Sequence, residues 1–196
     1  MKRPTAWIFL CSLLACGGAE TGDIAPAGES ATTVADEETD AMEPQPGAGA
    51  ARADIVDAEG RGLGAVILNE SGGEVALAGA LIGLSPGEHG FHIHETGTCD
   101  PPGFESAGNH LAPAGNPHGF HAEGGPHPGD LGNLVAGADS IATVEFETTL
   151  VSLHGGDASL LDDDGSALVV HADPDDYMSQ PAGNSGARIA CGVIEE

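Results

Sequence analysis

The sequence predicts an all-β domain over residues 51–196, an antiparallel sandwich or barrel of eight strands with two long loops. Short apolar or alternating segments recur at regular spacing, and turn-forming residues separate several of them. Aromatic residues make up only 4% of the chain, and Gly accounts for 31 of its 196 residues. This composition favours short strands and Gly-rich turns over long helices. With 40% hydrophobic residues, the chain is long enough to bury one core of ordinary size.

Each expected strand is a short run with strand-like composition, and Gly-containing turns at 59–60, 71–73, 85–87 and 164–165 punctuate the series. Strands of this length with such turns are typical of antiparallel sheets. In chain order the expected strands are 51–56, 63–69, 74–84, 90–95, 131–135, 141–147, 167–171 and 188–194.

Two segments, 96–130 and 172–187, do not resemble strands and are rich in Gly, Pro, Asn and Asp. Loops this long inside a compact domain usually carry function. The acidic run at 162–164, followed by Gly165, predicts a hairpin turn. A calcium loop is disfavoured there because the distal Glu is missing.

Residues 1–15 have the features of a signal segment. Lys2 and Arg3 precede an apolar run over 7–14, far shorter than the roughly 20 residues that cross a bilayer. The run ends in LLAC followed by Gly17, which resembles the lipobox of bacterial lipoproteins, with Cys16 as the lipidated residue. The alternative is an ordinary secretory signal with a chance Cys. We expect a lipid anchor on the periplasmic side of a bacterial membrane, and Gly17 favours the outer membrane.

Residues 16–50 predict a linker behind that anchor. They are acidic, lack Lys and Arg, contain three Pro and show no strand or helix periodicity. Such segments remain disordered, and this one would reach about 30–35 Å as a flexible chain. Its expected role is to hold the domain off the membrane.

The charge balance excludes some partners. The chain has 5 Lys and Arg against 31 Asp and Glu. Such a surface repels phosphate backbones, which argues against nucleic acid as a partner. It also argues against electrostatic docking to anionic lipid, so the expected membrane contact is the anchor alone.

Two of the four cysteines fall outside the domain, Cys11 in the signal and Cys16 at the anchor. Cys99 and Cys191 remain as an even pair in an oxidising compartment, so a disulfide between them is expected. It would close a long loop, for which the chain-entropy account gives on the order of 4–5 kcal/mol.

The histidine spacing suggests metal chemistry. His92 and His94 alternate along an expected strand, so both point to one face about 6.6–6.8 Å apart, with Phe91 and Ile93 on the other. The loop that follows contains ligand types that zinc prefers, and another His ends a later strand. These further candidates are His110, His118, His127, Asp130 and His171.

Three other histidines are ambiguous. His121 could replace His118, although the spacing from His110 and the Gly that follows favour His118. We expect His89 and His154 to be solvated surface residues.

Several segments in order resemble the copper/zinc superoxide dismutase family: GFHIHE (90–95), SAGNH (106–110), GPHPGDLGN (125–133), LVVHADPDD (168–176) and GNSGARIACGVI (183–194). The resemblance covers essentially all of 51–196. It implies a Greek-key sandwich or barrel. It also implies dismutation of superoxide to oxygen and hydrogen peroxide by a copper redox cycle beside a structural zinc.

The resemblance further implies residue roles. Copper would be held by His92, His94, His110 and His171, and zinc by His110, His118, His127 and Asp130. His110 would bridge the metals and carry a proton during the reaction, and Asp175 would orient ligands of both. Arg188 would attract the anion above copper, and Cys99 and Cys191 match the family disulfide.

This chain departs from the family in its charges. Its domain has three Arg and no Lys, and Asp173 takes the place of a steering lysine. Pro181 and Ala182 replace a polar pair that many relatives have. We therefore expect a rate below the diffusional limit that salt leaves flat or raises.

Two other functions are considered: a non-enzymatic periplasmic lipoprotein that binds copper and zinc, and a surface adhesion or scaffold protein. The family includes monomers and dimers, so the choice between monomer and homodimer stays open.

Overall fold

The computed structural model describes residues 49–196; the expected signal segment, Cys16 and nearly all of the linker lie outside the described residues. The described chain is all-β, as expected, with one short 3-10 turn, and none of its helical segments is long and apolar enough to cross a membrane. The elements are β1 (Ala50–Asp57), β2 (Gly62–Ser71), β3 (Glu74–Ile82), β4 (Gly87–His89), β5 (Phe91–His94), η1 (Glu105–Ala107), β6 (Leu134–Ala136), β7 (Ile141–Thr148), β8 (Ala167–His171) and β9 (Arg188–Glu195).

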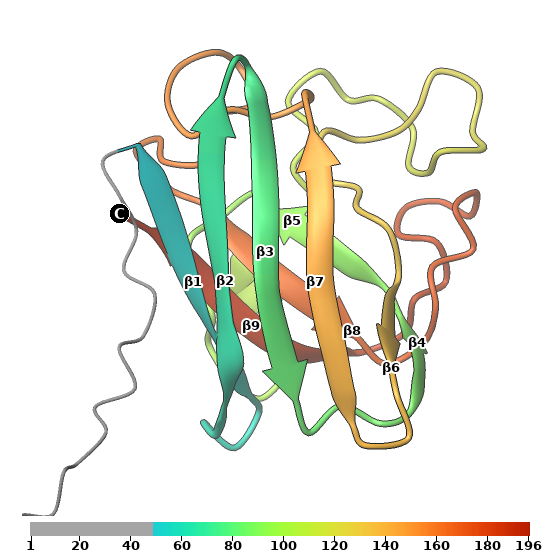
Figure 1. The fold of residues 1–196 in the computed structure, drawn as a ribbon. Coiled ribbons are helices and arrows are strands. Elements are labelled where there is room, and N and C mark those ends of the chain that lie inside the picture. Colours follow the sequence, from blue (N-terminus) through green and yellow to red (C-terminus); the bar gives the residue numbers. More distant parts are fainter. Residues whose placement is uncertain (1–48) are drawn as a thin grey trace, which may run out of the picture. The chain divides into compact units, whose positions relative to one another are not determined.

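All strands belong to one antiparallel sheet of order β4-β6-β7-β3-β2-β1-β9-β8-β5. The edge strands β4 and β5 are separated only by Gly90, so the sheet curls back on itself into a nearly closed barrel. Figure 1 shows β1, β2, β3 and β7 side by side, with β9, β8 and β5 crossing behind them. The pairings of β3 with β7 and of β1 with β9 require the long connections typical of Greek-key folds.

Each expected strand is present, and β4 is additional. The sequence offers one strand over 90–95, but the chain changes partners at Gly90: β4 pairs with β6, whereas β5 pairs with β8. The pattern of hydrophobic residues does not reveal where a chain changes from one neighbouring strand to another. The expected hairpin at 162–165 is wrong: a turn forms there, with Gly165 N donating to the Asp162 carboxylate, but it follows a loop instead of a strand.

The core explains where a site can form. In β1, buried and more exposed residues alternate along much of the strand, as in strands with one solvent face. β5 and β8 are buried along their whole length. Phe91, Ile93 and Val170 belong to the main core cluster, so the inner face of these strands lines the barrel. Their other face is therefore buried beneath segments outside the barrel.

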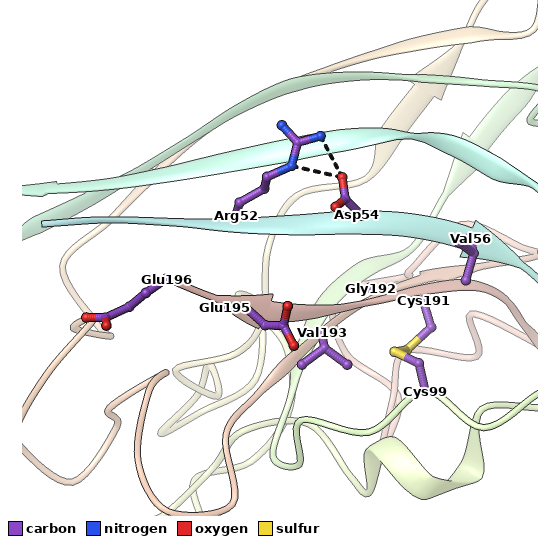
Figure 2. Close-up of a pocket in the computed structure, with 9 residues that line it drawn as sticks. All are labelled: Arg52, Asp54, Val56, Cys99, Cys191, Gly192, Val193, Glu195 and Glu196. Carbon is purple, nitrogen blue, oxygen red and sulfur yellow. Dashed lines mark hydrogen bonds and ion pairs between the residues drawn. A yellow bond between two sulfur atoms is a disulfide. The ribbon is translucent and has the colours of Figure 1, made fainter. Parts of the chain in front are cut away.

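The expected disulfide is present and joins Cys99 to Cys191, with Cα atoms 5.7 Å apart. It ties the first long loop to β9. Figure 2 shows this bond beside a pocket lined by β1 and β9, where Arg52 forms an ion pair of 2.7 Å with Asp54. None of the expected metal ligands lines this pocket.

Candidate metal centre

The site begins with the alternation along β5. Phe91 and Ile93 point into the main core, while His92 and His94 lie on the opposite face and are fully buried. His171 is the last residue of β8, which pairs with β5, and Arg188 lies opposite His171 on β9. The strand alternation and the sheet register thus bring three of the expected copper ligands and the expected anion-binding Arg together on the adjacent strands β5, β8 and β9.

The first long loop returns along the free edge of β5. Ile93 N donates to Gly129 O at 2.8 Å, and Leu111 N donates to Ile93 O at 2.9 Å. These bonds place His110 and Asp130 directly beside the strand. A Cβ at Gly129 would collide with the Ile93 carbonyl, so the close approach requires glycine there.

The first ligand group comprises His92, His94, His110 and His171, whose candidate ligand atoms all lie within 4.8 Å of one another. One nitrogen of each ring is buried without a hydrogen-bond partner: Nδ1 of His92 and Nε2 of the other three. Buried polar atoms in proteins are normally satisfied, so four such atoms facing one another fit a bound metal ion. A four-imidazole set suits Cu(II).

The second group is built around Asp130. Its Oδ1 lies 2.9 Å from His110 Nδ1, 2.8 Å from His118 Nδ1 and 3.3 Å from His127 Nδ1. Ligands about 2.0 Å from a tetrahedral zinc lie about 3.3 Å from one another, so these spacings fit a zinc ion held by three imidazoles and a carboxylate.

His110 is the residue that the two groups share. Its Nδ1 faces Asp130, and its Nε2 is one of the unpartnered atoms of the four-histidine group. The structure places His118 in the second group, buried, whereas His121 is exposed with its ring 5.8 Å from that of Tyr177.

Asp175 connects the groups from behind. Its two carboxylate oxygens lie 2.9 Å from His92 Nε2 and 3.0 Å from His118 Nε2, so it orients one ligand of each group. Asn133 fixes Asp175 in turn: Asp175 N donates to Asn133 Oδ1 at 2.8 Å, and Asn133 Nδ2 donates to Asp175 O at 3.0 Å. Sequence reasoning missed this role of Asn133, although it ends the GPHPGDLGN segment.

Burial sets the protonation of the copper-side ligands. It lowers the pKa of His92 to about 4 and that of His171 to about 3, so both rings are neutral at neutral pH, as metal ligands must be. Burial favours a higher pKa for Asp130, but hydrogen bonds with His110 and His118 hold that pKa well below its usual range. Asp130 is therefore an anion that can neutralise part of a cation's charge.

His118 differs from these rings. Burial opposes its protonation, but the hydrogen bonds to Asp130 and Asp175 raise its pKa to about 9. A metal at this position takes the place of the Nδ1 proton, so zinc binding releases that proton.

Arg188 borders the cavity that also contains His94, His110 and His171. Its Nη1 donates to Phe104 O at 2.7 Å and its Nη2 to Gly108 O at 2.6 Å. These carbonyl acceptors could not be read from side-chain motifs. They fix the guanidinium without cancelling its charge, so it can attract an anion.

The expectation that His89 is a surface residue is wrong. His89 is 1% exposed, its Nδ1 lies 2.7 Å from His171 O, and its Nε2 lies 2.8 Å from Ser85 O. It therefore packs behind a copper-side ligand, and nothing in the local sequence signals that role. His154 is exposed, as expected, and lies 3.0 Å from the Glu196 carboxylate.

Comparisons with known proteins point to the family that the sequence motifs resemble. A family model described as copper/zinc superoxide dismutase matches residues 63–194. A "Superoxide dismutase [Cu-Zn]" of Caulobacter vibrioides is 48% identical over 140 residues, covering 70% of this chain and 80% of that protein. A SOD-like protein from Bacillus subtilis has a TM-score of 0.70 at 41% identity, covering 72% and 96% of the two chains. The Cu/Zn superoxide dismutase from Brucella abortus has a TM-score of 0.63 at 30% identity, covering 74% and 99%.

Proposed function

The chain belongs to the copper/zinc superoxide dismutase family, and we propose from its site that it catalyses the dismutation of superoxide to oxygen and hydrogen peroxide. Copper and zinc are its cofactors. The observation that carries the proposal is the position of His110, whose two ring nitrogens face two different ligand groups. A site for a single metal has no need of such a shared ring.

Four histidines would hold copper, and His110, His118, His127 and Asp130 would hold zinc. Copper, when bound, supplies the one-electron transfers of the reaction, while zinc has no redox chemistry and fixes the shared ring. The protein's own contribution is geometry, because each ligand ring is buried and oriented by a hydrogen bond or by the sheet.

Arg188 and His110 act on the substrate side. The Arg188 guanidinium lies in the same cavity as the copper-side ligands and gives an incoming anion a positive partner. His110 Nε2 is the nitrogen that faces the copper group, so it is the atom placed to hold a proton destined for peroxide. His110 Nδ1 faces Asp130 and would be the nitrogen that holds zinc.

A superoxide assay on the zinc-loaded protein, with and without copper, tests the function. We expect activity only with copper. His171→Ala removes one copper ligand but no zinc ligand, so it should abolish activity and leave the zinc content unchanged. Copper and zinc bound at full occupancy with no dismutation would instead favour a metal-binding lipoprotein.

We also propose that Cys16 carries a lipid anchor that holds the domain on the periplasmic side of the membrane, more specifically the outer membrane. The support is the LLACG segment behind a short apolar run with a basic start. Labelling with a radioactive fatty acid should mark the wild type but not Cys16→Ser, and membrane fractionation should identify the membrane. Equal labelling of both proteins would exclude Cys16 as the site.

The family contains monomers and dimers, and we propose a homodimer as the hypothesis to be tested. Sedimentation velocity of the domain at two concentrations distinguishes the two states.

A further inference from the structure

Glu95 follows the copper-side ligand His94 directly and borders the cavity together with Asn109, His110 and Arg188. Its Oε1 accepts two hydrogen bonds from Asn109, one from the backbone N at 2.9 Å and one from Nδ2 at 3.0 Å. Glu95 N also donates to Asn109 O at 2.9 Å. Three hydrogen bonds therefore join Glu95 to the residue that precedes the shared ligand His110.

The residue before Asn109 is Gly108, whose carbonyl oxygen lies within hydrogen-bond distance of two side chains of the site. His94 Nδ1 lies 3.0 Å from it, and Arg188 Nη2 donates to it at 2.6 Å. The first contact makes Nδ1 of His94 the protonated nitrogen and leaves Nε2 free for a metal. The second sets the direction of the guanidinium. The Gly108 carbonyl is therefore the point at which a ligand and the anion-binding Arg are aligned together.

The Glu95 side chain also packs against Gly108. A Cβ at Gly108 would lie 2.8 Å from Glu95 Cγ and 2.9 Å from Oε1, and the backbone there has φ of 75°. Only glycine fits both the conformation and the contact. Glu95 thus holds residues 108–110 through hydrogen bonds on one residue and contact on its neighbour.

We propose that Glu95 is a positioning residue for the copper side of the site. Its hydrogen bonds to Asn109 fix the backbone on both sides of that residue. They thereby fix the Gly108 carbonyl, which orients His94 and Arg188, and the position of His110. This inference rests on the proposed function, because it takes His94 as a copper ligand and Arg188 as the residue that attracts the substrate anion. Hydrogen bonds to an ionised acceptor are stronger than neutral ones, which suits a clamp exposed to water.

The carboxylate has a second consequence. It places a negative charge on the rim of a cavity that an anion must enter. Clamping and repulsion can be separated because the Oε1 of a glutamine accepts the same two hydrogen bonds without the charge. Glu95→Gln should keep the alignment and relieve the repulsion, whereas Glu95→Ala loses both.

The test compares copper- and zinc-loaded wild type with Glu95→Gln, Glu95→Ala and Asn109→Ala. Glu145→Ala serves as the charge control, because Glu145 is exposed on β7 and does not border the cavity. The measurements are the Cu(II) electron paramagnetic resonance spectrum, the affinity for azide as a small anion, the metal content and the dismutation rate.

Glu95→Ala should bind both metals yet show an altered copper spectrum, weaker azide binding and a rate at least about tenfold lower, because small misplacements of catalytic groups are costly. Asn109→Ala, which keeps the backbone donor, should show a smaller change of the same kind. Glu95→Gln should keep the wild-type spectrum and bind azide more tightly, by about twofold. Glu145→Ala should keep the wild-type copper spectrum and metal content, and its azide affinity should change by less than that of Glu95→Gln.

A wild-type copper spectrum and azide affinity in Glu95→Ala would overturn the proposal, as would a glutamine variant that behaves like the alanine variant. Neither result would touch the proposed function, which fails only if the metal-loaded wild type has no dismutase activity. The spectra and the azide titration therefore test the clamp separately from the reaction.

Discussion

At the scale of single residues, Arg188 carries the most direct prediction. It donates to two carbonyl oxygens, so its charge remains available to an anion in the cavity. Arg188→Ala should lower the dismutation rate severalfold and leave the copper and zinc contents unchanged. Arg188→Lys keeps the charge but cannot donate to both carbonyl oxygens in the same way. Its rate should therefore lie between those of the wild type and the alanine variant. A wild-type rate in the alanine variant would remove Arg188 from the mechanism.

His89 tests whether the residues behind the ligands support the fold. It is buried, and its ring nitrogens face the carbonyl oxygens of His171 and Ser85. His89→Leu has a similar volume but leaves both carbonyls unpaired, so the free energy of unfolding should fall by about 1–3 kcal/mol. Urea unfolding measures this. A change no larger than that of a surface substitution would show that the contacts of the His89 ring do not stabilise the fold.

Asp176 gives a prediction about pH. Its carboxylate accepts hydrogen bonds from the Ser179 hydroxyl at 2.6 Å and from Ser179 N at 2.7 Å, which lower its pKa from 3.8 to about 2. Because the folded pKa is the lower one, this group stabilises the fold fully above about pH 4 and loses its effect as the pH falls through about 2. Asp176→Asn should therefore be less stable than the wild type at pH 7.

The stability difference between Asp176→Asn and the wild type should shrink as the pH falls from 4 towards 2. Denaturant unfolding of both proteins across that range measures it. A difference that stays constant with pH would mean that the charge of Asp176 is not responsible.

At the scale of elements, the strands were predictable wherever one face is buried and the other is wet. In β7, Ala142 and Val144 are buried, while Thr143 and Glu145 are exposed, and the sequence shows that alternation of apolar and polar residues. The start of β6 was not predictable. The sequence places it at residue 131, but Asn133 is bound to Asp175 and to the Tyr177 hydroxyl, so the strand begins at Leu134.

The same contrast holds for the candidate site. Histidine spacing and the family resemblance were enough to propose every member of the two ligand groups, because ligand identity lies in side chains. The supports that use backbone groups could not be proposed. The Gly108 carbonyl, which receives both His94 and Arg188, has no signature in the sequence beyond a glycine.

The disulfide between Cys99 and Cys191 affects both the stability of the fold and the position of Arg188. It ties β9 to the loop that contains Phe104 and Gly108, the acceptors of Arg188. Because its cysteines are separated by 92 positions in the sequence, its removal should cost on the order of 4 kcal/mol of unfolding free energy. Cys99→Ala combined with Cys191→Ala should also weaken azide binding, since the acceptors of Arg188 lose their anchor. Unchanged azide affinity would confine the disulfide to a role in stability.

At the scale of the whole molecule, charge sets this chain apart. In the described range the fixed cations are Arg52, Arg61 and Arg188, with no Lys. Arg52 is paired with Asp54 at 2.7 Å, and Arg61 with Asp57 at 2.7 Å, so both are partly compensated. An anion approaching from afar therefore meets a net negative surface, and only near the cavity does Arg188 attract it.

The rate should therefore respond to salt in a way that steered enzymes do not. Where long-range attraction guides the substrate, added salt screens it and the rate falls steeply. Here the long-range field repels superoxide, and the Debye length shortens from about 30 Å at 0.01 M to about 10 Å at 0.1 M salt. The second-order rate constant should stay flat or rise over that range and remain below the diffusional ceiling. Glu145→Lys together with Glu147→Lys on β7 should raise the low-salt rate and reduce any rise of the rate with salt, because they weaken the repulsion without touching the cavity. A steep fall of the wild-type rate with salt would show that local charges around Arg188 dominate the approach over the acidic surface.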